Sequence, residues 1–225
     1  MFAKILILLL IALPVYANDI YVTQSGATLD LDITQDGQNN VVGNSTTAAT
    51  VTGATSTIDI DQVGSSNVLA FDVNGDTFTG TFNVTGDSND IDFNCDSTGG
   101  NSSCDTATAS ITWVGSSNDL DIDIGETSDA SNATVTITGS SGSDSNVVAA
   151  TIDGTSAILT LTVNGDTNNY LIDIDGDGDV NGHTFIHSHT GSIADVDITQ
   201  SGIYDNYVSL TTTGDNHDID ISQTD

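Results

Sequence analysis

A short alternating pattern of apolar and polar residues recurs along this chain, and each stretch ends at a corner that contains glycine. Such corners include Ser25-Gly26, Val63-Gly64 and Val114-Gly115. Two stretches make one repeat of about 22 residues, and a fixed period of roughly 20–50 residues is typical of solenoids, whose coils bury their apolar faces only against neighbouring coils. The repeat predicts an all-β protein, a β-solenoid with two strands per coil and about eight coils with cross-β-like ladders.

Residues two apart on a strand share a face, so the alternation also predicts which side chains point inward. Apolar residues and corner amides form the inward set, and a slip of one residue would bury the polar outward set. The pattern predicts these strands: 18–24, 29–35, 40–46, 56–62, 67–73, 78–84, 89–95, 107–113, 118–124, 133–138, 146–152, 157–163, 168–174, 194–200, 206–212 and 217–223. Small residues loosen the pattern at 40–55 and 125–145, and we expect an insertion at about 175–193.

The first residues differ from the repeats. Lys4 precedes an apolar run, Ile5–Leu13, and the segment ends with Val15-Tyr16-Ala17. This is the pattern of a secretory signal peptide, and it is too short for a membrane anchor. We therefore expect residues 1–17 to be a signal peptide and residues 18–225 to be a single solenoid domain. The domain is expected to be secreted, extracellular or at the cell surface, without membrane insertion.

The charge balance and the predicted inward residues each argue against one class of function. Lys4 is the only Lys or Arg in the chain, against 32 acidic residues, of which all but Glu126 are Asp. Nucleic-acid binding requires cations that neutralise phosphates, so nucleic acid is not an expected partner. Catalysis requires converging groups in a pocket, and the predicted inward residues are apolar or amides. The chain is therefore not expected to be an enzyme, and no catalytic residue is predicted.

The clearest repeats follow Ser-x5-Gln-x4-Asn-x5-Gln, in the copies STIDIDQVGSSN, LDITQDGQNN, DVDITQSG and HDIDISQ. In degenerate form over most of residues 18–225, this pattern resembles the curlin repeat of bacterial curli fibre subunits. The resemblance implies a two-sheet β-solenoid in which inward amides stack in ladders and which polymerises into extracellular functional amyloid. By position, it implies these ladder and assembly residues: Gln24, Gln35, Asn40, Ser56, Gln62, Asn67, Asn89, Asn118, Asn168, Gln200 and Gln223.

The predicted ends of the solenoid independently favour self-assembly. Neither the first nor the last predicted strand is flanked by a segment with the sequence of a cap. Uncapped strand edges expose backbone groups that template another chain. We expect the chain to be its own partner, as a structural subunit of a head-to-tail, curli-like filament in adhesion, a biofilm matrix or a surface coat. The alternative is a monomeric secreted β-solenoid that binds ice or Ca²⁺ through rows of Thr or Asp.

Rows of outward aspartates raise the question of counterions. Asp90 and Asp92 precede Asp119, Asp121 and Asp123 on one predicted face. The other predicted face carries Asp30, Asp32, Asp59 and Asp61, and then Asp195, Asp197, Asp218 and Asp220. Carboxylates about 4.8 Å apart repel by about 1 kcal/mol per pair in a water-like dielectric. Ca²⁺, Mg²⁺, high salt or protonation would offset this repulsion. Alternatively, the aspartates act as gatekeepers that keep the strands soluble.

One segment resembles the front of an EF-hand Ca²⁺ loop. It reads D-x-D-x-D-G, although Thr184 takes the position of the final Glu and a polar surface loop is the alternative interpretation. Its candidate metal ligands are Asp173, Asp175, Asp177, Asp179 and Asn181. No cofactor is required by this sequence, and Ca²⁺ is the candidate ion for this segment.

The remaining chemistry-bearing residues are few. His183, His187 and His189 fall in the expected insertion, where we expect them to face solvent, with Zn²⁺ or Cu²⁺ binding as the alternative. Cys95 and Cys104 are the only cysteines. A close pair in an exported protein most often forms a disulfide, here at the corner between two strands.

Overall fold

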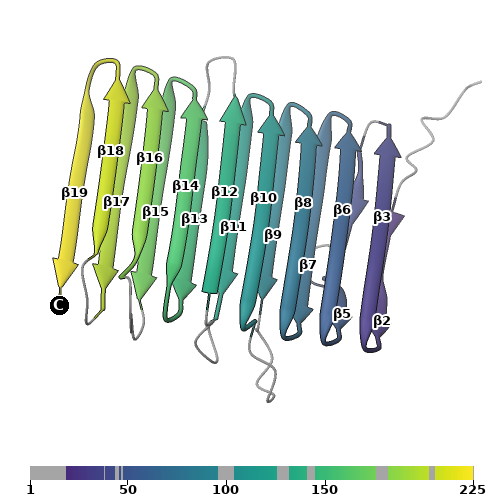
Figure 1. The fold of residues 1–225 in the computed structure, drawn as a ribbon. Helices are drawn as coiled ribbons and strands as arrows, with labels where there is room; N and C mark the ends of the chain where they lie inside the picture. The colour runs from purple at the N-terminus through teal and green to yellow at the C-terminus, as the bar shows by residue number, and fades with distance from the viewer. Residues whose placement is uncertain are drawn as a thin grey trace, which may run out of the picture.

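The computed structural model describes residues 19–37, 39–43, 46, 48–95, 104–125, 132–140, 145–175, 182–202 and 206–224. Over these residues the protein is all β without a helix, and its strands stack into a β-solenoid of two parallel sheets (Figure 1). Figure 1 shows the strands side by side in chain order, from β2 and β3 at the purple end to β19 at the yellow end. The predicted fold class is confirmed. Across this part of the chain there is also no helix long and apolar enough to cross a membrane.

Consecutive coil strands alternate between the two sheets, which we name sheet A and sheet B. Sheet A contains eleven strands: β1 (Asp19–Ile20), β2 (Thr23–Ser25), β4 (Val41–Val42), β5 (Ala49–Thr52), β7 (Ser66–Asn74), β9 (Ser88–Cys95), β11 (Ser117–Ile124), β13 (Ser145–Asp153), β15 (Thr167–Asp175), β17 (Ile193–Ser201) and β19 (His217–Thr224). Sheet B contains eight: β3 (Thr28–Asp36), β6 (Thr55–Val63), β8 (Thr77–Thr85), β10 (Thr106–Val114), β12 (Asn132–Ser140), β14 (Ala157–Asn164), β16 (Thr184–Thr190) and β18 (Tyr207–Thr213). From β3 to β18 the solenoid makes about seven turns, one for each step between neighbouring strands of sheet B.

The alternation of the sequence sets the alternation of burial. Along β6, for example, exposed and buried residues alternate at every position from Thr55 to Val63. The residues predicted to face inward are buried from Ile33 through Gln200. They form one continuous core between the sheets, in which aromatic side chains such as Phe82 and Trp113 are fully enclosed. Because every coil contributes the same face, stacking supplies the burial that a single coil lacks.

The expected insertion at 175–193 contains a core strand, so this prediction is wrong for Thr184–Thr190. These residues form β16, which pairs in parallel with β14 and β18 and completes sheet B. Two of its three inward positions are histidines, His187 and His189, so the apolar alternation that marks the other strands is weak here. An additional strand moves all later strands to the opposite sheet. Consequently, the Asp195 and Asp218 rows lie on sheet A with Asp90, and not on the opposite sheet as predicted.

The predicted strand 40–46 is also corrected. Sheet A contains two short strands, β4 and β5, at this level: Val42 pairs with Leu69 of β7, and Ala49 pairs with Phe71. Gly43, directly after β4, has a positive φ of 65°, and a Cβ there would come within 2.4 Å of the Ala70 carbonyl oxygen. A residue without a side chain is therefore required at this bend.

Candidate functional site

A column of buried asparagines runs through sheet A, at the first inward position of five successive strands. Each Nδ2 donates to the Oδ1 of the next asparagine, at 2.8, 2.6, 2.7 and 2.5 Å in turn. An amide carries a donor and an acceptor, so an in-register parallel stack satisfies each buried amide through its neighbours in the adjacent coils. The column consists of Asn67, Asn89, Asn118, Asn146 and Asn168.

Asn146 belongs to this column but was not predicted to belong to it. It lies on β13, in register with Asn118 and Asn168. The segment before it is rich in Gly and Ser, which hid the spacing of the repeat. A simpler signal was present, because a Ser-Asn or Thr-Asn pair opens each strand of the column, as Ser145-Asn146 does here.

Glutamines form two shorter ladders, one near each end of the solenoid. Gln62 Nε2 donates to Gln35 Oε1 at 2.8 Å in sheet B. Gln223 Nε2 donates to Gln200 Oε1 at 2.9 Å in sheet A. Between them, apolar residues such as Trp113 fill the equivalent inward positions. The glutamine ladders therefore lie on the terminal strands of the two sheets, with Gln35 buried on β3 and Gln223 exposed on β19.

The other expected ladder residues lie beside these ladders. Asn40 is fully buried and donates to the backbone carbonyls of Gln35 and Val63, at 3.2 and 2.7 Å. Ser56 is buried on β6, and Gln24 is half-buried on β2. The side chains of all three residues face inward.

Three histidines lie inside the core near the C-terminal end, which overturns the expectation that they face solvent. His183, His187 and His189 are each at most 1% exposed. His187 Nδ1 lies 3.2 Å from the Leu161 carbonyl oxygen, and because a carbonyl only accepts, this nitrogen carries the proton. His189 Nδ1 lies 3.0 Å from the Tyr170 hydroxyl. β16 thus places polar rings where other strands place aliphatic side chains.

Burial changes the ionisation of this cluster. It lowers the pKa of His187 to about 4 and lowers the pKa of His189, with the neighbouring His217 contributing to the latter shift. It also raises the pKa of the Tyr170 hydroxyl. All three groups are therefore neutral at pH 7, and protonating His187 would place an uncompensated charge in the core.

Outward aspartates stack in register on sheet A. Asp119 lies beside Asp90, and Asp121 lies beside Asp92, on neighbouring strands. The pKa is raised at four of these carboxyl groups, mainly by burial and secondly by repulsion from a neighbouring carboxylate. The four are Asp90, Asp92, Asp121 and Asp123. A raised folded-state pKa means that the charged carboxylate destabilises the folded protein. This destabilisation is relieved as the pH falls toward 4 and the carboxyl groups bind protons.

The candidate Ca²⁺ ligands are only partly described by the structure. Asp173 and Asp175 lie on the extended strand β15, with side chains facing outward, and Ser201 Oγ donates to Asp175 Oδ1. Asp177, Asp179 and Asn181 lie outside the described residues. Within the described ranges, no group of three or more His, Cys, Asp or Glu side chains is arranged to hold a metal ion.

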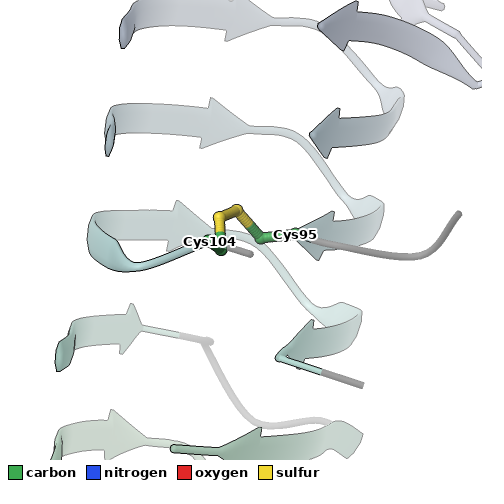
Figure 2. The surroundings of a disulfide bond; sticks show 2 residues. All are labelled: Cys95 and Cys104. Atoms are coloured by element: carbon green, nitrogen blue, oxygen red, sulfur yellow. A yellow bond between two sulfur atoms is a disulfide. The ribbon is translucent and has the colours of Figure 1, made fainter. Parts of the chain in front are cut away.

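Cys95 and Cys104 are joined by a disulfide (Figure 2). Cys95 ends β9 in sheet A, and Cys104 lies just before β10 in sheet B, with their Cα atoms 5.9 Å apart. Both side chains are fully buried. The bond therefore ties the two sheets together at one corner of a single coil.

The C-terminal end of the stack leaves inward side chains uncovered. Val196 and Ile198 on β17 are 0% and 2% exposed, whereas Ile219 and Ile221, their partners on β19, are 37% and 46% exposed. Sheet B ends at β18, so no described strand lies opposite β19 across the core. The end presents an apolar and amide surface together with two open strand edges.

Fold and site together define a class of protein, a parallel two-sheet β-solenoid with buried amide ladders and an uncovered C-terminal strand. Comparison of the chain with protein-family models, with curated proteins and with solved structures gave no match.

The asparagine column provides a test of the ladder. Asn118→Leu is expected to lower the free energy of unfolding by about 1–3 kcal/mol, because it leaves the Asn89 donor and the Asn146 acceptor buried without their partner. Urea denaturation followed by circular dichroism would measure this loss. Ser110→Thr, an outward change on β10, is the matched control and should change stability by less than about 0.5 kcal/mol. Equal losses from the two variants would contradict the assigned register.

Proposed function

We propose that this protein is the structural subunit of an extracellular filament, in which copies stack end to end through the open edges of the solenoid. The single observation that carries this proposal is the uncovered end at β19. Its inward residues Ile219, Ile221 and Gln223 continue core rows that are buried in every preceding coil of sheet A from β7 onward. Exposed apolar rows beside unpaired backbone groups are the features through which β-structures add further strands.

The amide ladders support the same function. Gln223 donates to Gln200 and is exposed on the last strand of the stack. A second copy that placed an inward Gln at this level would extend the ladder without any change in the first copy. This continuity is what the resemblance to curlin repeats implies for a curli-like, secreted functional amyloid. The rows of inward amide and apolar side chains would then continue from one subunit into the next, as they continue from coil to coil within one chain.

Filament formation is tested on the purified chain from Asn18 to Asp225. We expect unbranched filaments by negative-stain microscopy, with fibre-diffraction reflections near about 4.8 and about 10 Å. Ile221→Asp should raise the critical concentration at least about tenfold, since it replaces about 1.5–3 kcal/mol of side-chain burial with a charge. Ile158→Asp is the matched control, because Ile158 is similarly exposed, at 42%, but lies on the outer face of β14. A wild-type chain that remains monomeric under all conditions would exclude the proposed function.

Counterions should govern the rate of this assembly. Each junction brings like-charged aspartate rows together, and the chain beyond Lys4 has no Lys or Arg to offset them. NaCl, Ca²⁺ or acid should therefore each accelerate filament growth. A greater effect of Ca²⁺ than of NaCl at equal ionic strength would indicate bound cations in addition to screening.

Threonine columns on sheet B favour a second candidate, an ice-binding surface. Outward hydroxyl side chains stack in register on consecutive strands, in the rows Thr57–Thr79–Thr108–Thr134, Thr81–Ser110–Thr136–Thr160 and Thr112–Thr138–Thr162. Threonine is also a common outward residue on any strand. The two functions separate in one measurement, because an ice-binding protein would cause thermal hysteresis as a monomer.

A further inference from the structure

The two ends of the solenoid do not match each other in the same orientation. Sheet A has nine levels, since β1 shares a level with β2 and β4 with β5, whereas sheet B has eight. The described path therefore enters in sheet A and leaves in sheet A. At the C-terminal end, the next free position along the coil lies in sheet B, above β18. The position after it lies in sheet A, above β19.

A second copy in the same orientation cannot fill both positions. If its β1 and β2 lie above β19, its β3 lies in sheet B two levels above β18, and not in the level directly above it. One strand position in sheet B then stays empty, with unpaired backbone groups on both sides of the gap. Such groups cost free energy when they are buried without a partner.

A second copy rotated by half a turn about the solenoid axis fills both positions. Its first level, β1 and β2, then lies above β18, and its β3 lies above β19. Strands of the two sheets run in opposite directions, as β18 and β19 do in Figure 1. A half-turn reverses the direction and exchanges the sheets, so every new strand pair is parallel, as all pairs within the chain are.

The side chains of β19 and β3 match in this arrangement. Asp218–Gln223 reads D-I-D-I-S-Q, and Asp30–Gln35 reads D-L-D-I-T-Q, so four of the six residues are identical and the other two are conservative. In the unrotated arrangement, the segment above β19 would instead be Asp19–Gln24. This segment is identical to Asp218–Gln223 at only three of six positions. With β3 above β19, the ladder that ends at Gln223 would continue directly into the ladder that begins at Gln35.

We infer that successive subunits are related by a half-turn, with β3 of one copy stacked in parallel on β19 of its neighbour and β1–β2 on β18. This inference rests on the proposed filament function and adds the partner surface, the register and the symmetry. Sheet A of one subunit continues as sheet B of the next. The rise per subunit is about 41 Å, from eight and a half coils at about 4.8 Å each.

Cysteine cross-linking in assembled filaments tests this register. Ser222 on β19, Thr34 on β3 and Thr23 on β2 are all exposed and outward-facing. A half-turn places Ser222 beside Thr34 of the next copy, at the spacing of neighbouring strands, which a disulfide can bridge. The unrotated arrangement instead places Ser222 beside Thr23. Equimolar mixtures of S222C with T34C, and of S222C with T23C, are polymerised under reducing conditions and then oxidised.

We expect covalent dimers from the S222C and T34C mixture at least about tenfold more abundant than from the S222C and T23C mixture. Filaments in which the T23C mixture reacts preferentially, or in which neither mixture reacts, would overturn the half-turn and leave the filament function standing. Chains that form no filament at all would overturn both. Helical reconstruction of wild-type filaments gives a second measurement, because a rotation near 0° per subunit contradicts the inference.

Discussion

Replacing Trp113 with alanine is expected to cost about 3–5 kcal/mol of folding free energy. The indole is 1% exposed and lies on β10 between Val84 of β8 and Gly139 of β12. A Cβ added to Gly139 would lie 2.3 Å from indole carbons, so the ring occupies the space that a side chain on β12 would fill. Truncating it would leave a cavity that spans two coils. Since domains of this kind have about 5–15 kcal/mol in total, the loss would be severe.

Denaturant unfolding in an Ile221→Asp background measures this effect without a contribution from assembly. Trp113→Phe is the matched control. It keeps most of the ring and removes an indole N–H that has no hydrogen-bond partner within the described residues, so its cost should be much smaller. If alanine and phenylalanine have similar effects, the indole does not fill the core in the way described.

The second large effect is a loss of stability in acid that depends on His187. Burial lowers the pKa of His187 to about 4, while its ordinary value in an unfolded chain is 6.5. As the pH falls from about 6.5 to about 4, the unfolded chain binds a proton that the folded core does not accept. The stability present above pH 6.5 is therefore lost progressively across this window, by about 3 kcal/mol in full.

His187→Phe isolates this contribution. Phenylalanine retains a ring beside Tyr170 and Phe185 and does not titrate. The free energy of unfolding, measured from pH 7.5 to 4.5, should fall more steeply for the wild type than for the variant. The aspartate rows are present in both proteins, so their effects cancel in the difference. His189 interacts with His187, so the difference reports His187 together with this coupling. Parallel pH profiles would show that His187 is not the titrating group.

The aspartate rows and His187 are expected to have opposite effects on filament assembly in acid. Acid neutralises the aspartate rows on the surface, which favours stacking, and it disfavours the core around His187. Assembly should therefore be fastest at a mildly acidic pH, where the aspartate rows begin to bind protons and the histidine cluster remains neutral. The position of this optimum follows from the folded-state pKa shifts of both groups.

The histidine strand also shows where prediction from sequence failed. Strands such as β6 and β11 could be predicted because Ile and Leu alternate with Asp, and only one register buries the apolar set. In β16 the inward positions after Phe185 are His187 and His189, which an alternation of apolar residues does not select. Whether a histidine is buried depends on the neighbouring strands, here Leu161 and Tyr170, which lie on β14 and β15.

The sequence by itself determined the solenoid, its inward and outward faces and most of its amide positions, because these follow from local periodicity and from a corner repeated every half coil. The tertiary structure decided which sheet each strand joins, since this depends on counting every strand, and one missed strand exchanges the sheets for all that follow. It also decided that Asn146 completes the asparagine column. The uncovered β19 and the uneven number of levels likewise appear only when all the coils are stacked, because strand partners lie more than twenty residues apart in the chain.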